Sequence, residues 1–359
     1  MKQRRKGADA GGTASSPKGG TNAMSGAAVK ASESKTRKVL VRTITGGLAV
    51  ILFNLVIWAG HWYTVIWIML LQYGCFRELS RVGIEPRFEQ RLTGFQGLQW
   101  AWFVTVAWHI YGSWLFQLTG DDGVDTTGLP TALAALVDVH AMVSLLLYSS
   151  VFIASVLALR PPQECYLYQM QRICFTIVSL LMIFGQMQNV MDLIYKGLIW
   201  YFVPSSIVVT NDIMAYFTGV GIGRKFIDRP LLALSPNKTW EGFLGAIIWT
   251  VGFTFFFTGH VASFTWMVCP AQKLTWEVHS AITCEPHAIF QPIPDPSEYW
   301  PTTLLGPVRP VQLHMVAPAL FASVVGPFGG FVASGIKRAF DIKGESPPTS
   351  KRLSITFMF

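Results

Sequence analysis

The feature that most constrains this chain is a series of apolar runs that are long enough, or nearly so, to cross a lipid bilayer. A bilayer core of about 30 Å needs about 20 helical residues. Only 13% of the residues are charged, whereas a soluble globular protein carries about a quarter. The sequence therefore predicts an all-α polytopic integral membrane protein with about eight transmembrane helices. The runs are Val39–Gly60, Trp62–Phe76, Phe95–Leu118, Ala132–Leu159, Ile173–Met187, Gly197–Val220, Phe243–Val268 and Val311–Ser334.

The domain organisation follows from these runs. Residues 1–38 are rich in small polar residues and Lys without apolar periodicity, which predicts a disordered basic tail. Residues 39–343 form the transmembrane domain, and 344–359 form a divergent C-terminal tail. The second and fifth runs, Trp62–Phe76 and Ile173–Met187, are short, so each is either a half-span or the tilted partner of another helix.

The charge distribution predicts how the chain lies across the membrane. The first 42 residues hold ten Lys or Arg against two acids, which is the whole formal net charge of +8. Contact with anionic membrane lipid therefore explains the charge better than nucleic-acid binding does. Basic loops at Arg77–Arg91, Arg160–Arg172 and Arg224–Lys238 alternate with the acidic loop Gly120–Pro130. By the positive-inside rule, we expect the tail and the basic loops in the cytosol and Cys269–Pro310 in the lumen.

The five cysteines lack metal-site spacing. Cys269 and Cys284 are fifteen residues apart in the predicted lumenal segment, where either a disulfide or two free thiols is compatible with the sequence.

The stretch Asn211–Gly245 holds the strongest candidate site. Asp212 lies inside an apolar run, where a carboxylate costs roughly 2.5–3.5 kcal/mol unless it is paired or bound to a cation. This predicts a functional acid, either a metal ligand or part of a polar network. The alternative is a structural acid that pairs with a lysine, and Asn211 beside it suits either interpretation. Gly219, Gly221 and Gly223 do not have dinucleotide-binding spacing and indicate close helix packing instead.

The second half of this stretch predicts a helix start that could hold phosphate. Ser235 before Pro236 is typical of an N-cap followed by the first helical residue. Free N–H groups at a helix start attract anions. We expect Lys238 to contact a phosphate, Ser235 and Thr239 to cap the helix, and Glu241 to belong to the same cluster. The alternative is an ordinary cap beside a lysine that reaches towards the membrane surface.

Four segments carry a resemblance to a known family. NDIMAYFTG from Asn211, LSPNKTWEGF from Leu234, KGLIWYFVP from Lys196, and FASVVGPFGGFVASGIKRAFDIK from Phe321 are similar to the eukaryotic phosphatidate cytidylyltransferases. The resemblance implies a multi-pass enzyme of the endoplasmic reticulum that joins CTP to phosphatidate, releases pyrophosphate and uses Mg²⁺.

The resemblance also implies site residues. The expected catalytic residues are Asp212, Lys238, Lys337 and Arg338, with Asp212 also holding the metal. The expected substrate-binding residues are Asn211, Ser235, Thr239, Glu241, Ser334 and Lys343. The lipid phosphate is itself the nucleophile in such a reaction, so the protein has to align two anions and neutralise their charge. Other expected partners are membrane lipids, and a homo-oligomer stays open.

The resemblance ends at Lys343. The family pattern continues there with an aspartate and later acids, whereas this chain has Gly344 and then no His and no Asp. Because those acids are the family's principal metal ligands, we expect this chain to lack activity, as a dead or truncated member of the family. A transporter is a further alternative, but it would predict internal symmetry between the two halves, and none is visible.

Overall fold

The computed structural model describes residues 40–41, 43–82, 84–92, 94–119, 135, 137–185, 187–271, 277–279, 282–293 and 308–339. Within these ranges the secondary structure is helical apart from one β-bridge between Pro230 and Thr239. The predicted disordered tail, Lys343 and the divergent tail lie outside the described residues. The chain divides into two compact units, Met1–Leu55 and Val56–Phe359.

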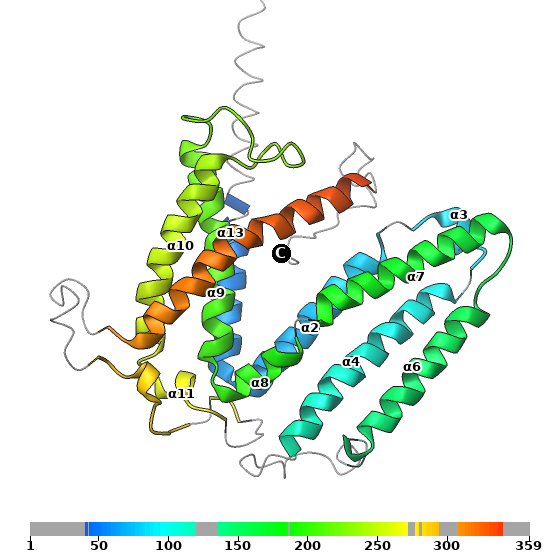
Figure 1. Ribbon diagram of the computed structural model, residues 1–359, viewed down its shortest axis with the longest axis horizontal. Coiled ribbons are helices and arrows are strands. Elements are labelled where there is room, and N and C mark those ends of the chain that lie inside the picture. Colours follow the sequence, from blue (N-terminus) through cyan, green and yellow to red (C-terminus); the bar gives the residue numbers. More distant parts are fainter. Residues whose placement is uncertain are drawn as a thin grey trace, which may run out of the picture. The chain divides into compact units, whose positions relative to one another are not determined.

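An apolar helix covers Thr43–Ala59. The elements that follow are shown in Figure 1. They are α2 (His61–Ser80), α3 (Pro86–Glu89), α4 (Phe95–Thr119), α6 (His140–Leu157), α7 (Gln163–Phe184), α8 (Gln188–Lys196), α9 (Ile199–Ile222), α10 (Trp240–Val261), α11 (Thr265–Val268), the short 3₁₀ helix η1 (Ala288–Phe290) and α13 (Pro310–Ala339).

The prediction of an all-α polytopic membrane protein is confirmed. Four segments of the described chain are long and apolar enough to cross a membrane: α6, α7 together with α8, α10 and α13. The helix α9 has 24 residues, but the polar pair Asn211 and Asp212 interrupts its apolar character. The predicted count of eight spans stays a prediction.

The two short runs belong to longer helices than their apolar residues indicate. The second run lies in α2, which has 20 residues, and most of the fifth lies in α7, which has 22 and ends at Phe184. Both helices continue through polar residues beyond these runs. Arg172, which was placed in a cytosolic loop, is instead a buried residue of α7. Its guanidinium donates to the carbonyl oxygens of Ser80 and Val82, and so satisfies the otherwise unpaired C-terminal end of α2.

The helices of the Val56–Phe359 unit pack in two groups. In one, α9, α10 and α13 contact each other; in the other, α4 contacts α6 and α7, and α2 contacts α7. The short helix α8 contacts members of both groups, α9 in the first and α2 and α4 in the second. The candidate site lies in the first group.

Glycines bring α9 and α10 close together. A Cβ atom on Gly242 would lie 3.0 Å from the carbonyl oxygen of Ala215 and 3.2 Å from Cα of Gly219. A Cβ atom on Gly245 would lie only 2.3 Å from Cγ2 of Thr218. Close packing through small residues is therefore confirmed at Gly219, but it is wrong at Gly221, where a Cβ atom would meet nothing within 4 Å.

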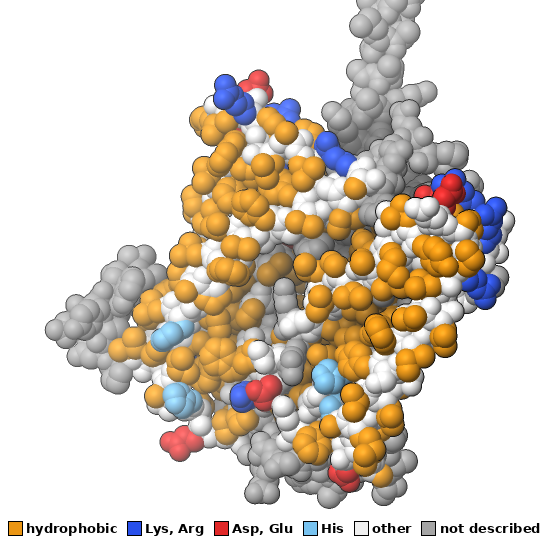
Figure 2. All heavy atoms as spheres, turned by 45° about the vertical axis from the view of Figure 1, so that its right-hand side comes forward, with side chains coloured by type: hydrophobic (Ala, Val, Ile, Leu, Met, Phe, Trp, Pro, Cys, Tyr) orange, Lys and Arg blue, Asp and Glu red, His pale blue; other side chains and the backbone are white. Residues whose placement is uncertain are grey.

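The surface has the character of a membrane protein. Large apolar side chains point outwards, including Leu157, which is 78% exposed, and Ile248, which is 73% exposed. Figure 2 shows hydrophobic side chains over most of the visible face, with Lys and Arg mainly in its upper half. An outer surface this apolar is suited to contact with lipid.

A disulfide joins Cys269 and Cys284, so the first of the two sequence alternatives holds. The segment is also tied to the helices, because the N–H of Ala271 donates to the carbonyl oxygen of Tyr195 at the end of α8 (2.8 Å).

Candidate functional site

The helix α9 presents two neighbouring polar residues to different surroundings. Asn211 is buried, and its Oδ1 accepts a hydrogen bond from Thr250 on α10 (3.5 Å). Asp212 is one residue further on, which turns its side chain by about 100°. The residue as a whole is exposed in the polypeptide, and its carboxylate interacts electrostatically with Lys238. Asn211 therefore fixes the helix against α10, whereas Asp212 remains accessible.

Lys238 reaches from the α9–α10 loop to α13. Its ammonium donates to the carbonyl oxygen of Pro327 (3.3 Å) and lies 4.5 Å from the ring centroid of Phe331. Gly330 leaves the space for it, because a Cβ atom there would lie 2.8 Å from Nζ. The loop cation is thus held against one face of α13.

Asp212 and Lys238 attract each other without direct pairing. Burial lowers the pKa of Lys238 from its ordinary value, and the nearby Asp212 carboxylate raises it in part. Within the described part of the chain, the direct ion pairs are Arg87–Glu85 and Lys196–Asp192, and Asp212–Lys238 is not among them. Both charged groups can therefore contact a third, charged group.

The predicted start of the helix after the loop is wrong. The helix α10 begins at Trp240, and Thr239 is its N-cap, with Oγ1 accepting from the N–H of Gly242 (3.1 Å). Ser235 does not cap it; its carbonyl oxygen accepts from the N–H of Lys238 in a turn (3.1 Å). The reason is the antiparallel pairing of residues 230–231 with 238–239, which includes a bond from the Leu231 N–H to the Lys238 carbonyl oxygen (3.0 Å). This pairing delays the helix until Trp240.

Glu241 organises the loop that carries Lys238. Its carboxylate accepts hydrogen bonds from the backbone N–H groups of Arg224 (3.1 Å), Phe226 (3.1 Å) and Ile227 (2.8 Å). Arg224 has a positive φ of 61°, and its guanidinium donates to the carbonyl oxygen of Pro236 (2.6 Å). Glu241 was predicted to bind substrate; in the structure its oxygens hold backbone, so its described contacts position the loop.

The C-terminal residues of the predicted site lie along α13. The Ser334 hydroxyl donates to the carbonyl oxygen of Gly330 (2.9 Å), and Arg338 is exposed. Lys337 is half-buried and interacts electrostatically with Glu78 near the end of α2. Sequence reasoning missed Glu78, because its distance from Lys337 along the chain gives no spacing signal.

Lys238, from the α9–α10 loop, and Lys337, on α13, both lie along one face of α13. Residues Gly330, Ser334 and Lys337 follow the i, i+4, i+7 spacing that shares one helix face. Lys238 contacts this face at Gly330, and Lys337 lies about 10 Å further along the axis, at 1.5 Å per residue. Together with Asp212, these residues form what we call the α9–α13 site: Asp212, Lys238, Ser334 and Lys337. An extended polyanion suits this spacing of positive charge.

The α9–α13 site supplies one carboxylate for a metal. The described residues contain no group of three or more His, Cys, Asp or Glu side chains placed to hold a metal ion. Mg²⁺ is commonly held by one or two carboxylates together with substrate phosphates and water. Asp212 alone fits the lower end of that range, so a metal here would depend on oxygens from the substrate.

These features define a class of protein: a multi-pass helical membrane protein whose polar site combines a mid-helix acid with loop and helix cations. The chain belongs to the Cytidylyltransferase family, whose model matches residues 40–347. The match covers every predicted site residue and ends four residues beyond Lys343. The resemblance seen in the sequence is thus confirmed, and the match does not favour a transporter.

Individual relatives agree with this assignment. The chain is 33% identical over 317 residues to "Probable phosphatidate cytidylyltransferase" of Dictyostelium discoideum, covering 86% of this chain and 64% of the relative. It is 32% identical to phosphatidate cytidylyltransferase 1 of Arabidopsis thaliana, covering 88% and 74%. It is 34% identical to phosphatidate cytidylyltransferase 1 of Homo sapiens, covering 81% and 62%. The chain thus spans about two thirds of the length of these relatives. No solved structure matches it significantly.

Proposed function

We propose that this protein has the site of a phosphatidate cytidylyltransferase, which joins CTP and phosphatidate into CDP-diacylglycerol and releases pyrophosphate in phospholipid biosynthesis, and that turnover also requires the acids that the family pattern places after Lys343. The main structural support for the proposal is the position of the Lys238 ammonium. It contacts the carbonyl oxygen of Pro327 and the ring of Phe331, and it interacts electrostatically with Asp212. The relatives that are 32–34% identical to this chain bear the name of that enzyme.

The protein does not have to form a covalent bond to either substrate in this reaction. A phosphate oxygen of phosphatidate attacks the α-phosphorus of CTP. The bond from that phosphorus to the oxygen bridging to the β-phosphate breaks, and pyrophosphate leaves with the bonding electrons. The main barrier is the repulsion between two anions, so positioned cations supply most of the catalysis. Lys238 would hold the triphosphate from the loop side, with Lys337 and Arg338 further along α13.

Mg²⁺, when bound, would neutralise phosphate charge and stabilise the leaving group. Asp212 would hold it together with substrate oxygens. In this proposal Asn211 and Glu241 position the site from α9 and α10. Thr239 does the same as the N-cap of α10. Ser334 lies on the α13 face that the nucleotide would contact.

The proposed setting is the endoplasmic reticulum membrane, with the N-terminus and the 223–239 loop in the cytosol. This orientation gives the α9–α13 site access to soluble CTP. The Cys269–Cys284 disulfide supports it, because a disulfide between α10 and α13 suits an oxidising lumen. A cysteine placed at Asn237 in a chain otherwise lacking accessible thiols should react with an impermeant maleimide from the cytosolic side of sealed microsomes. Glycosylation at Asn237 would contradict this orientation.

The experiment that tests the activity follows CTP-dependent formation of a CDP-lipid from phosphatidate in reconstituted vesicles. It uses the chain itself and a chimera that continues after Lys343 with the sequence of a relative. We expect the chimera to turn over and its Asp212→Asn variant to lose at least a hundredfold, the loss typical of a removed charge-stabilising group. Asp192→Asn is the matched control, because Asp192 is an exposed carboxylate on α8 paired with Lys196 (2.6 Å). A folded chimera that makes no product would overturn the proposal, and normal turnover by Asp212→Asn would overturn the role of Asp212.

A further inference from the structure

A pocket of about 350 Å³ lies outside the α9–α13 site, at the start of α4 and beside the turn between α6 and α7. Its wall is apolar, with side chains of Leu92, Phe95 and Leu98 and the open backbone of Gly94 and Gly97, and Arg160 is its one charged lining residue. This volume is within the range of ligand pockets, about 300–1,000 Å³.

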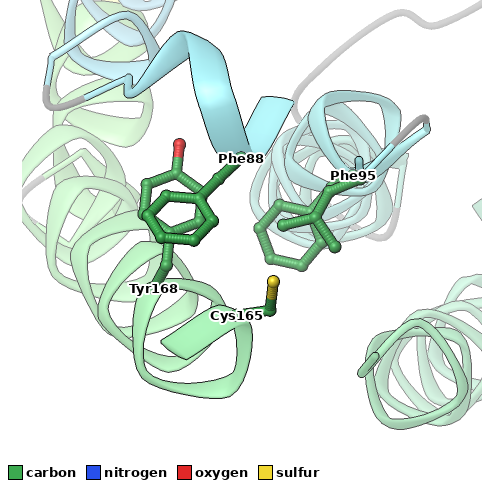
Figure 3. Close-up of a cluster of buried hydrophobic side chains, with 5 residues drawn as sticks. Phe88, Phe95, Cys165 and Tyr168 are labelled. Carbon is green, nitrogen blue, oxygen red and sulfur yellow. The ribbon is translucent and has the colours of Figure 1, made fainter. Parts of the chain in front are cut away.

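A packed cluster supports one side of the pocket. Phe88, Leu92, Phe95, Cys165 and Tyr168 are buried together, with α3 and the start of α4 against α7. Figure 3 shows the rings of Phe88 and Tyr168 stacked and the ring of Phe95 directed at the sulfur of Cys165. The pocket wall therefore rests on a core and is built before any ligand arrives.

Glycines keep the pocket open. A Cβ atom on Gly94 or Gly97 would meet no atom within 4 Å, so any larger side chain would point into open space. Gly94 also has a φ of +90°, which favours glycine. The absence of side chains here leaves a groove where a long α-helix begins.

Arg160 is held at the pocket by its backbone. Its N–H donates to Oε1 of Gln169 (3.0 Å), and Nε2 of Gln169 donates to the carbonyl oxygen of Ala158 (3.0 Å). Gln169 is fully buried, so it fixes this turn, while the Arg160 side chain is exposed. Arg160 forms no ion pair with any described residue. Arg91, next to the lining residue Leu92, is a second exposed cation.

We propose that this pocket binds one anionic phospholipid, with an acyl segment along the partly exposed Leu98, Ala101 and Ala158 and the headgroup phosphate at Arg160. A ligand of this pocket has to contact both the apolar groove and the positive charge of Arg160. A soluble anion would contact only Arg160. The N-terminus of α4 adds partial positive charge beside the same groove. Because the helix ends that flank the pocket carry arginines, it lies where headgroups meet acyl chains. This lipid site stands independently of the proposed enzymatic function.

The test is native mass spectrometry of the full chain released from nanodiscs of phosphatidylcholine with phosphatidylglycerol, a lipid that is not the proposed substrate. We expect retention of one phosphatidylglycerol in preference to phosphatidylcholine. Arg160→Ala should lower this preference about fivefold, the effect of one basic residue at a lipid surface. Arg229→Ala is the matched control, because it removes the same charge from an exposed loop elsewhere and should change nothing.

A second variant tests the apolar part. Gly97→Leu fills the groove from a helical position with free space, and leucine favours helix over glycine, so folding should be retained. We expect it to lower lipid retention while leaving the melting temperature unchanged or raised. Inorganic phosphate at millimolar concentration should not displace the lipid. Unchanged retention in both Arg160→Ala and Gly97→Leu would overturn the site. An equal loss in Arg229→Ala would show that retention is only general charge attraction, and displacement by phosphate would show an anion site without an acyl groove.

Discussion

The ammonium of Lys238 lies 4.5 Å from the ring centroid of Phe331, although the two residues belong to a loop and to the last described helix of the chain. A cation over an aromatic face is attracted by the ring and is held without a carboxylate partner. The contact leaves the lysine charge uncancelled at close range, which is the condition a phosphate ligand requires.

Gly330→Ala should weaken CTP binding without unfolding the protein. The new methyl group would lie 2.8 Å from Nζ of Lys238, so the end of the flexible lysine has to move while the helix backbone stays in place. A lost or misdirected charge-assisted hydrogen bond costs about 1.5–3 kcal/mol, so we expect an increase in the Kd for CTP of about tenfold. Equilibrium CTP binding in nanodiscs measures it. Gly326→Ala on the same helix is the control, because a Cβ atom there meets nothing within 4 Å. Equal losses in both variants would contradict this explanation.

CTP binding should weaken at alkaline pH before an ordinary lysine would lose its proton. Burial lowers the pKa of Lys238, so its ammonium is present at low pH and is lost as pH rises through a value below the ordinary 10.5. Lys238→Arg should remove this alkaline loss, because the guanidinium stays charged throughout. Titration of the Kd for CTP against pH in the two proteins checks it. Parallel pH curves for lysine and arginine would show that another group titrates.

Glu241→Gln should loosen the 223–239 loop. The carboxylate accepts from three backbone N–H groups, and the neutral amide accepts these bonds more weakly. Trypsin cleaves after Arg224 and Lys225 but not after Arg229, which precedes Pro230, so we expect cleavage at the first two sites to become several-fold faster. Asp228→Asn is the control, because it removes an exposed charge from the same loop. The prediction fails if the two variants are cut at the same rate.

Counting thiols tests the disulfide. In the denatured, unreduced protein, a maleimide should label Cys75, Cys165 and Cys174, and reduction should expose Cys269 and Cys284 as well. The Cys269→Ser variant should then show one additional reactive thiol without reduction, because its partner is released. Mass spectrometry of the labelled chain gives the number directly. Full labelling of the unreduced wild-type chain would contradict the disulfide.

The segment after Lys343 should control turnover. Magnesium demands oxygen ligands, and the described site contains one carboxylate, Asp212. The acids that the family pattern places after Lys343 would supply further ligands to the metal. We expect the 359-residue chain to show little turnover and the chimera with a relative's segment to be active. Both should bind CTP, because Lys238 and Lys337 are common to them. Comparable turnover by the two proteins would mean that residues before Lys343 hold the metal.

The sequence alone determined the membrane class, the family and the two leading candidate site residues, Asp212 and Lys238. Apolar runs need only local composition to be recognised, and Asp212 stands out because a carboxylate in such a run is costly. Local patterns also indicated the glycine packing of α9 on α10, which Gly242 and Gly219 confirm.

Only the tertiary structure decided how the site is held. Ser235 followed by Pro236 has the local chemistry of a helix start, yet pairing of residues 230–231 with 238–239 moves the N-cap to Thr239. Lys238 contacts Pro327 and Phe331, and Arg172 satisfies the end of α2, through packing between residues far apart in the chain. Cap and turn preferences act over a few residues and are worth about 1 kcal/mol, whereas these long-range contacts exist only once the helices have packed. That difference in range is why the sequence indicated the residues and the packing of α9, α10 and α13 determined their partners.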